Sequence, residues 1–178
     1  CDGKCIDDVL APQNIGNKLP IDVNGLGFVG YGGSDMYPPE IPIDLITDFD
    51  EDEAYVHLCK HEDAEVALVH ECPRGFERNG RHQGKYSILA YIHRNRPSLV
   101  LTGHSHSPLI ARVDKAGTYV INPGNLGRYP DQDFGTFAEF EIDDNLFVKS
   151  VRAYKINGEA TITREINLEP PVETTVNQ

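Results

Sequence analysis

A strand–helix–strand order in the middle of the chain limits the fold more than any other feature. A short apolar run, residues 65–70, is followed by a loop and then by a helical pattern over residues 84–95, which Pro97 ends. A second apolar run, residues 98–101, comes next. Two short strands joined by a helix form a βαβ unit, whose strands lie parallel in one sheet. Residues 65–103 therefore predict an α/β protein.

Further elements are predicted on both sides of this unit. Residues 26–31 form an apolar run typical of a strand, and residues 48–60 predict a helix with acidic side chains in its first turn. The remainder of the chain is β-rich, with strands expected at residues 109–113, 118–122, 136–142, 146–156 and 160–168. We predict a single domain over residues 1–168, truncated at its amino end, and a disordered tail over residues 169–178.

The charge of the chain argues against broad binding to nucleic acid. Its 178 residues carry a formal net charge of −12 at pH 7. Binding to DNA or RNA without regard to sequence needs a positive face that releases counterions. A small phosphorylated substrate remains compatible with this charge, because bound metal cations reverse the local field.

Apolar runs and cysteines indicate where the protein works. No run reaches the roughly 18 apolar residues of a membrane helix, and the chain opens on no secretory signal. The four cysteines do not repeat a zinc-binding spacing. Free thiols are typical of a reducing compartment. We therefore expect a cytoplasmic protein that does not bind membranes.

Histidines follow both strands of the βαβ unit. His70 ends the first strand, and His104 and His106 come directly after the second. Ligand sites of open α/β sheets gather outside the carboxyl ends of the strands. In an extended chain residues i and i+2 point to the same face, so His104 and His106 can converge on one metal or on two bridged metals. Because imidazole binds zinc, manganese and iron, we predict that these three histidines are metal ligands.

Other motifs accompany the histidines in a fixed order. Gly30-Tyr31-Gly32-Gly33-Ser34 comes first, followed by Val69-His70-Glu71-Cys72-Pro73 and then by Thr102-Gly103-His104-Ser105-His106. Asn122-Pro123-Gly124-Asn125-Leu126-Gly127 comes last. In order and spacing the set, over roughly residues 25–130, resembles the later motifs of the calcineurin-like metallophosphoesterases.

The resemblance implies a fold, an activity and residue roles. The fold would be the carboxy-terminal part of a four-layer α-β-β-α sandwich. The activity would be hydrolysis of phosphomonoesters or phosphodiesters by a metal-activated hydroxide. His70 and His104 would bind one metal of a dinuclear site, and His106 would bind the other. The cofactors would be divalent ions (manganese, zinc, iron, nickel or magnesium), and the partner would be a small phosphorylated substrate.

The chain lacks the family's earlier motifs. Asp-x-His, Gly-Asp-x-x-Asp and a complete Gly-Asn-His-Asp or Gly-Asn-Cys-Asp do not occur in it. Cys1-Asp2 is similar to the end of the last of these motifs, and the only methionine is Met36. We interpret the sequence as the carboxy-terminal part of a phosphoesterase. The intact enzyme would hold two metals, and we expect one or none here, with impaired activity.

Two other functions stay open at this point. Three histidines with a water as fourth ligand also describe a mononuclear zinc hydrolase or hydratase. Without the amino-terminal ligands, the chain could instead be a non-catalytic scaffold that retains the fold. The number of metal ions bound per chain distinguishes these functions. A cupin-like barrel is disfavoured, because a βαβ unit precedes the histidines and the first glutamate after them is Glu139.

Overall fold

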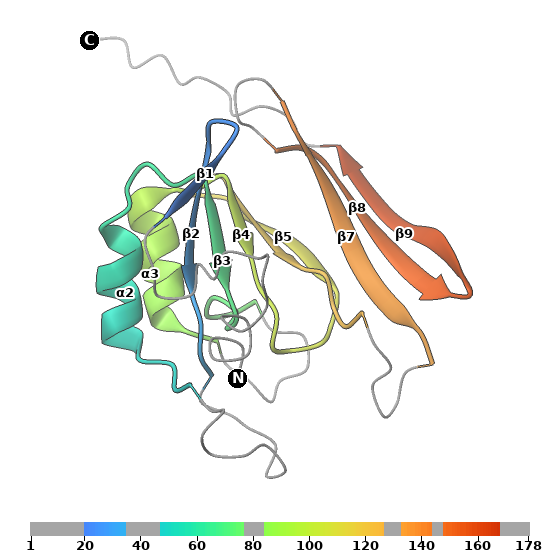
Figure 1. Cartoon of the computed structure of the whole chain (residues 1–178), viewed down its shortest axis with the longest axis horizontal. Helices are drawn as coiled ribbons and strands as arrows, with labels where there is room; N and C mark the ends of the chain where they lie inside the picture. Colours follow the sequence, from blue (N-terminus) through green and yellow to red (C-terminus); the bar gives the residue numbers. More distant parts are fainter. Residues whose placement is uncertain (1–19, 35–46, 77–83, 127–132, 144–147, 168–178) are drawn as a thin grey trace.

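The computed structural model describes residues 20–34, 47–76, 84–126, 133–143 and 148–167 (Figure 1). These residues form a six-stranded mixed sheet, a three-stranded antiparallel sheet and helices that pack on the larger sheet. In chain order the elements are β1 (Ile21–Val23), β2 (Leu26–Tyr31), α2 (Glu51–Cys59), β3 (Val66–Val69), α3 (Tyr86–Asn95), β4 (Leu99–Leu101), β5 (Leu109–Val113), β6 (Thr118–Asn122), β7 (Gly135–Ile142), β8 (Val148–Asn157) and β9 (Glu159–Asn167).

The predicted βαβ unit is confirmed. Strands β3 and β4 pair in parallel with Val66 opposite Leu99, and α3 connects them. The other predicted helix and strands are also present, with small shifts at their ends. Strand β1 is joined to β2 by Asn24 and Gly25, which have φ values of +55° and +87°. An Asn-Gly pair with positive φ is the favoured two-residue hairpin turn.

Parallel pairing brings four strand ends to one edge of the large sheet. The strand order is β1-β2-β3-β4-β6-β5, and β2, β3, β4 and β6 run parallel. Only the outer strands β1 and β5 are antiparallel to their neighbours. The carboxyl ends of the parallel strands lie at the lower edge of the sheet in Figure 1. This edge is where an open α/β sheet places its ligands.

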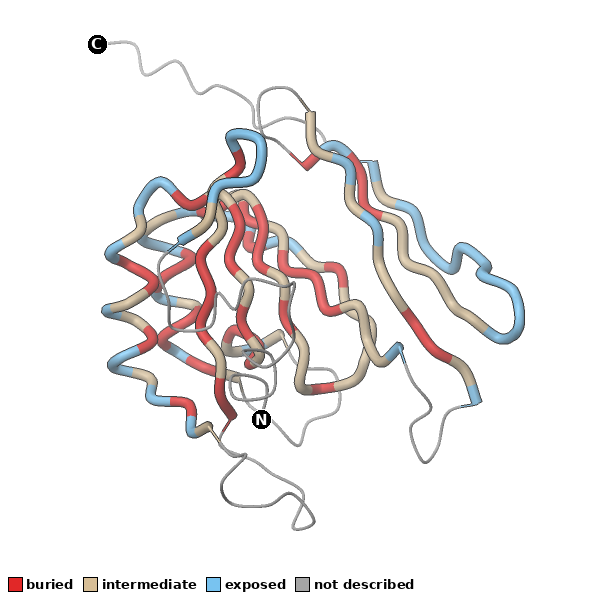
Figure 2. Tube along the Cα trace, viewed as in Figure 1, coloured by how far each residue is buried: buried red, intermediate tan, exposed pale blue. Residues whose placement is uncertain are grey.

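The large sheet is covered on both faces. Helices α2 and α3 pack on one face, and the three-stranded sheet β7-β8-β9 packs on the other (Figures 1 and 2). Successive side chains of a strand point to opposite faces. Val100 therefore joins the core cluster beneath the helices, whereas its neighbour Leu99 joins the cluster shared with the second sheet. Burial on both faces explains why the central strands read as continuous apolar runs.

The α/β class is confirmed, and the described residues form three layers: helices, large sheet and small sheet. Within the described ranges no helix is long and apolar enough to cross a membrane. The predicted disordered tail, residues 169–178, lies outside the described residues.

Candidate metal site

His70 and His104 meet at the carboxyl ends of two adjacent parallel strands. His70 follows β3 directly, and His104 follows shortly after the end of β4. Nδ1 of His104 lies 3.3 Å from Nε2 of His70, and the two rings meet at 73°. The backbone N–H of Gly103 donates to the carbonyl of His70 at 3.0 Å, so the two strand ends are joined next to the rings. Both side chains are half-buried.

The distance between these two nitrogen atoms fits ligands of one ion. Imidazole nitrogens bind zinc at about 2.0–2.1 Å, and in a tetrahedral site two such ligands lie about 3.3 to 3.4 Å apart. The observed 3.3 Å agrees with this value. Nitrogen ligands of this type also suit manganese and iron. The geometry of the pair is therefore compatible with two ligands of one divalent metal ion.

His106 does not stand in an extended chain with His104. Strand β4 ends at Leu101, and His104 and His106 have φ values of +57° and +53°. The backbone here is therefore not extended, and the convergence of the two rings does not follow from i and i+2 spacing. Among the described residues no three His, Cys, Asp or Glu side chains form a group that could hold a metal ion. The described contacts bring together His70 and His104, and a metal-binding role for His106 stays a prediction.

Asn122, the last residue of β6, anchors the loop that carries His104. Its side chain is 1% exposed. Its amide nitrogen Nδ2 donates to the carbonyl of Gly103 at 2.5 Å and to Oγ of Ser105 at 2.9 Å. Its oxygen Oδ1 accepts from the backbone N–H of Gly124 at 2.9 Å. Left-handed backbone costs a non-glycine residue about 1 kcal/mol or more, so the two histidines need such an anchor.

Ser34 and Glu71 form a buried pair beside the His104 ring. The hydroxyl of Ser34 donates to Oε1 of Glu71 at 2.6 Å, and its Oγ lies 3.3 Å from Nδ1 of His104. Oε1 of Glu71 is 3.7 Å from the same nitrogen. Both residues belong to the sequence motifs, but neither was predicted to have a role. The available signal was an acid placed directly after a histidine that ends a buried strand.

Tyr31 ties the start of the loop containing Ser34 to helix α2. The phenol of Tyr31 donates to Oε2 of Glu53 at 3.2 Å. Burial, followed by the negative charge of Glu53, raises the pKa of Tyr31 to about 12. The phenol is therefore a neutral donor throughout the physiological range, and this contact does not depend on pH there.

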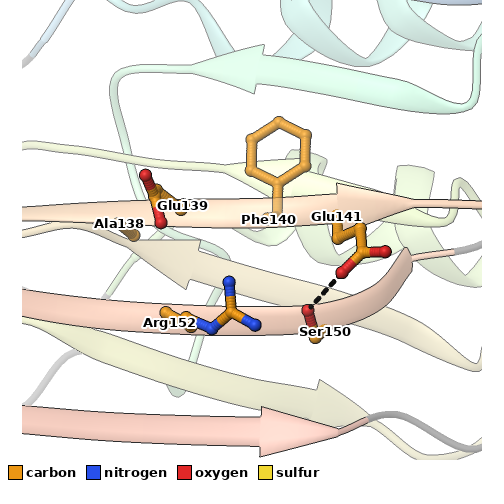
Figure 3. Close-up of a pocket in the computed structure, with 6 residues that line it drawn as sticks. All are labelled: Ala138, Glu139, Phe140, Glu141, Ser150 and Arg152. Carbon is orange, nitrogen blue, oxygen red and sulfur yellow. Dashed lines mark hydrogen bonds between the residues drawn. The ribbon is translucent and has the colours of Figure 1, made fainter. Parts of the chain in front are cut away.

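A separate hollow lies on the three-stranded sheet (Figure 3). Its volume is about 440 Å³, and its walls come from β7 and β8: Ala138, Glu139, Phe140, Glu141, Ser150 and Arg152. The charged groups of the walls already have partners in the sheet. Glu141 pairs with Lys149 at 2.9 Å, and Arg152 pairs with Glu165 at 2.8 Å. No predicted site residue lines the hollow, and we assign it no function.

Comparisons with known proteins place the chain in a family. A model of the calcineurin-like phosphoesterase superfamily domain matches residues 42–145, and the chain belongs to this superfamily. The match includes His70, His104 and His106, as well as Glu71 and Asn122. A search of curated proteins gives no significant match.

Solved structures with a similar arrangement share little sequence with the chain. Vps29 complexed with zinc from Entamoeba histolytica is 14% identical, with 79% of this chain and 97% of that chain covered and a TM-score of 0.39. A conserved uncharacterized protein (predicted phosphoesterase) from Streptococcus pneumoniae is 14% identical, with 79% and 81% covered and a TM-score of 0.37. GAP50 of the Plasmodium inner membrane complex is 9% identical, with 84% and 52% covered and a TM-score of 0.43.

Proposed function

We propose that the protein is a divalent-metal-dependent phosphoesterase whose ion is held by His70 and His104. The observation that carries this proposal is the 3.3 Å approach of Nε2 of His70 and Nδ1 of His104 in a chain of the calcineurin-like phosphoesterase superfamily. A divalent ion at such a site polarises a phosphoryl oxygen and activates a water nucleophile.

The chain's own residues supply binding and orientation. His70 and His104 offer imidazole nitrogen ligands, and Asn122 holds the backbone that carries His104. The net charge of −12 repels a free phosphate ester. A cation between the two histidines offsets this repulsion locally. We therefore propose small phosphomonoesters or phosphodiesters as the substrate class, without a preference between them.

Metal content and hydrolysis, measured on the same preparations, test the proposal. The chain is loaded with Mn²⁺ or Zn²⁺, dialysed, and assayed by mass spectrometry for metal and with p-nitrophenyl phosphate and bis(p-nitrophenyl) phosphate for activity. His104→Ala is expected to abolish the bound metal. His93→Ala is the matched control, because His93 is an exposed histidine in α3. Unchanged metal content in His104→Ala would show that the site assignment is wrong.

The number of ions per chain separates the proposal from its alternatives. Two ions per chain with hydrolysis indicate a dinuclear phosphoesterase that is complete as it stands. One ion with weak hydrolysis agrees with the expectation of an impaired site. One ion that is lost when any one of His70, His104 and His106 is replaced by alanine would support a mononuclear three-histidine enzyme. No metal uptake and no hydrolysis would support a scaffold that retains the fold.

We also infer a cytoplasmic location for the protein. Cys59 is buried and forms no disulfide among the described residues, which supports a reducing compartment. Mass spectrometry of the protein, alkylated with iodoacetamide during lysis, should find Cys59 carrying the alkyl label, and a Cys59 held in a disulfide would contradict the inference.

A further inference from the structure

We propose that Ser34 supplies an oxygen ligand to the metal ion of His70 and His104, and that Glu71 orients the Ser34 hydroxyl for this purpose. The proposal rests on the metal site proposed above and adds residues that neither the family match nor the sequence motifs assign. Its basis is the arrangement of polar atoms around Nδ1 of His104.

Two donor atoms stand at the same distance from this nitrogen. Nε2 of His70 and Oγ of Ser34 each lie 3.3 Å from Nδ1 of His104. This spacing matches that of neighbouring ligands of one ion, because nitrogen and oxygen ligands bind at about 2.0–2.2 Å. The three side chains follow different strands, and the donor atoms of His70 and Ser34 both lie next to Nδ1 of His104.

The hydroxyl proton of Ser34 is directed away from the histidines. A carboxylate only accepts hydrogen bonds, so in the 2.6 Å contact Ser34 donates and Oε1 of Glu71 accepts. Which atom donates in the 3.3 Å contact between Oγ and Nδ1 of His104 depends on the tautomer of the ring. When Nδ1 is a metal ligand it carries no proton, and Oγ, whose own proton is directed to Glu71, would then present an oxygen lone pair to the same ion.

The burial of Glu71 also favours a cation at this place. Glu71 and Ser34 are 2% and 3% exposed. A buried carboxylate is costly unless it is hydrogen-bonded and its charge is compensated. Among the described residues, the polar partners of the Glu71 side chain are Ser34 and His104. A divalent cation on Nδ1 of His104 supplies the compensating charge.

The backbone fixes Ser34 in this place. Its N–H donates to the carbonyl of Thr47 at 3.0 Å, and its carbonyl accepts from the N–H of Phe49 at 3.3 Å. Gly33 has a φ of +100°, and a Cβ there would stand 2.5 Å from the carbonyl oxygen of Asp48. Only glycine fits this position. The glycine-rich loop therefore positions Ser34 next to the His104 ring.

A cysteine at position 34 tests the proposal by spectroscopy. In the full chain loaded with Co²⁺, Ser34→Cys is expected to show a thiolate-to-cobalt charge-transfer band in the near ultraviolet. The wild type sets the baseline, because it already contains four cysteines. Ser87→Cys is the control, since Ser87 is a buried serine in α3. It should show no such band, and a merely structural role of Ser34 would produce none either.

Mn²⁺ affinity gives a second readout that does not depend on a new ligand. Ser34→Ala and Glu71→Gln should each weaken Mn²⁺ binding about 10-fold, the loss expected when a group around a metal ligand is removed. Glu65→Gln should leave it unchanged, because the Glu65 carboxylate accepts from the N–H of Gly27 near the other end of β2. Circular dichroism of each variant shows whether it is folded.

The outcomes separate this proposal from the one on which it rests. If the wild type binds Co²⁺ but folded Ser34→Cys shows no band, Ser34 is not a ligand. If Ser34→Cys does not fold, unchanged Mn²⁺ affinity in folded Ser34→Ala excludes Ser34 as a ligand in the same way. If the wild type, like His104→Ala, binds neither Co²⁺ nor Mn²⁺, the proposed metal site does not exist and both proposals are wrong.

Discussion

Replacement of Asn122 by alanine should destabilise the protein and release the loop that carries His104. The substitution removes the hydrogen bonds to the carbonyl of Gly103, to Oγ of Ser105 and from the N–H of Gly124. Asn122 is 1% exposed, so water does not replace its amide without a rearrangement. The loop in which His104 and His106 have left-handed backbone conformations would lose the hydrogen bonds that hold it.

The magnitude follows from the groups left behind. A buried polar group that loses its partner costs about 1–3 kcal/mol. Gly103 and Gly124 are only half-buried, which places each of their backbone groups at the low end of that range. The sum predicts a loss of about 2–4 kcal/mol in the free energy of unfolding. With a urea m-value of about 2 kcal/mol/M, the midpoint should fall by about 1–2 M.

Urea unfolding followed by circular dichroism measures this loss. Asn95→Ala is the matched control, because Nδ2 and Oδ1 of Asn95 are buried in α3 and have no hydrogen-bond partner among the described residues. Its stability should not fall, because the substitution breaks no hydrogen bond to a described residue and removes two buried polar atoms. A midpoint for Asn122→Ala that equals that of the wild type would refute the reasoning, since the loop would then hold its conformation without the anchor.

Two further perturbations test other parts of the structure. Gly33→Ala should lower the free energy of unfolding, measured with urea, by more than about 2 kcal/mol, because Gly33 combines positive φ with a close carbonyl oxygen. Gly32→Ala should be nearly neutral, because a Cβ there would meet nothing within 4 Å. Equal effects of the two substitutions would contradict this account of the loop. Burial, with a smaller contribution from His61, lowers the pKa of His57 below its usual 6.5. The unfolded state therefore binds more protons at His57 than the folded state, so the free energy of unfolding should fall as pH drops below about 6.5. In urea midpoints measured from pH 7.5 to 5, His57→Gln should show a weaker pH dependence than the wild type. An unchanged slope would rule out His57 as the cause.

The fold was predictable because its signals are local. The apolar runs of β3 and β4, the periodicity of α3 and the Pro97 that follows it are visible in short windows of sequence, and they define the βαβ unit. The carboxyl ends of parallel strands then placed His70 near His104 without any further information. The βαβ topology determines this pairing, so it can be predicted from the sequence.

The remaining parts of the site depend on contacts between distant residues. Ser34 and Glu71 are 37 positions apart, and Asn122 reaches back 19 positions to Gly103. A window of sequence cannot show such contacts, because they arise only after the sheet has formed. The same reason explains why the backbone at His104 and His106 is not extended as the sequence suggested. Asn122, a residue of another strand, holds the loop that contains His104. No sequence pattern around the histidines predicts the left-handed backbone of His104 and His106.

The central claim is that Nε2 of His70 and Nδ1 of His104 bind one divalent ion. Anomalous diffraction at the zinc edge, from crystals grown with Zn²⁺, tests it most directly. We expect a single anomalous peak about 2.0–2.1 Å from each of these nitrogen atoms. Zinc bound elsewhere on the chain, with the two nitrogen atoms still 3.3 Å apart and no peak between them, would contradict the account.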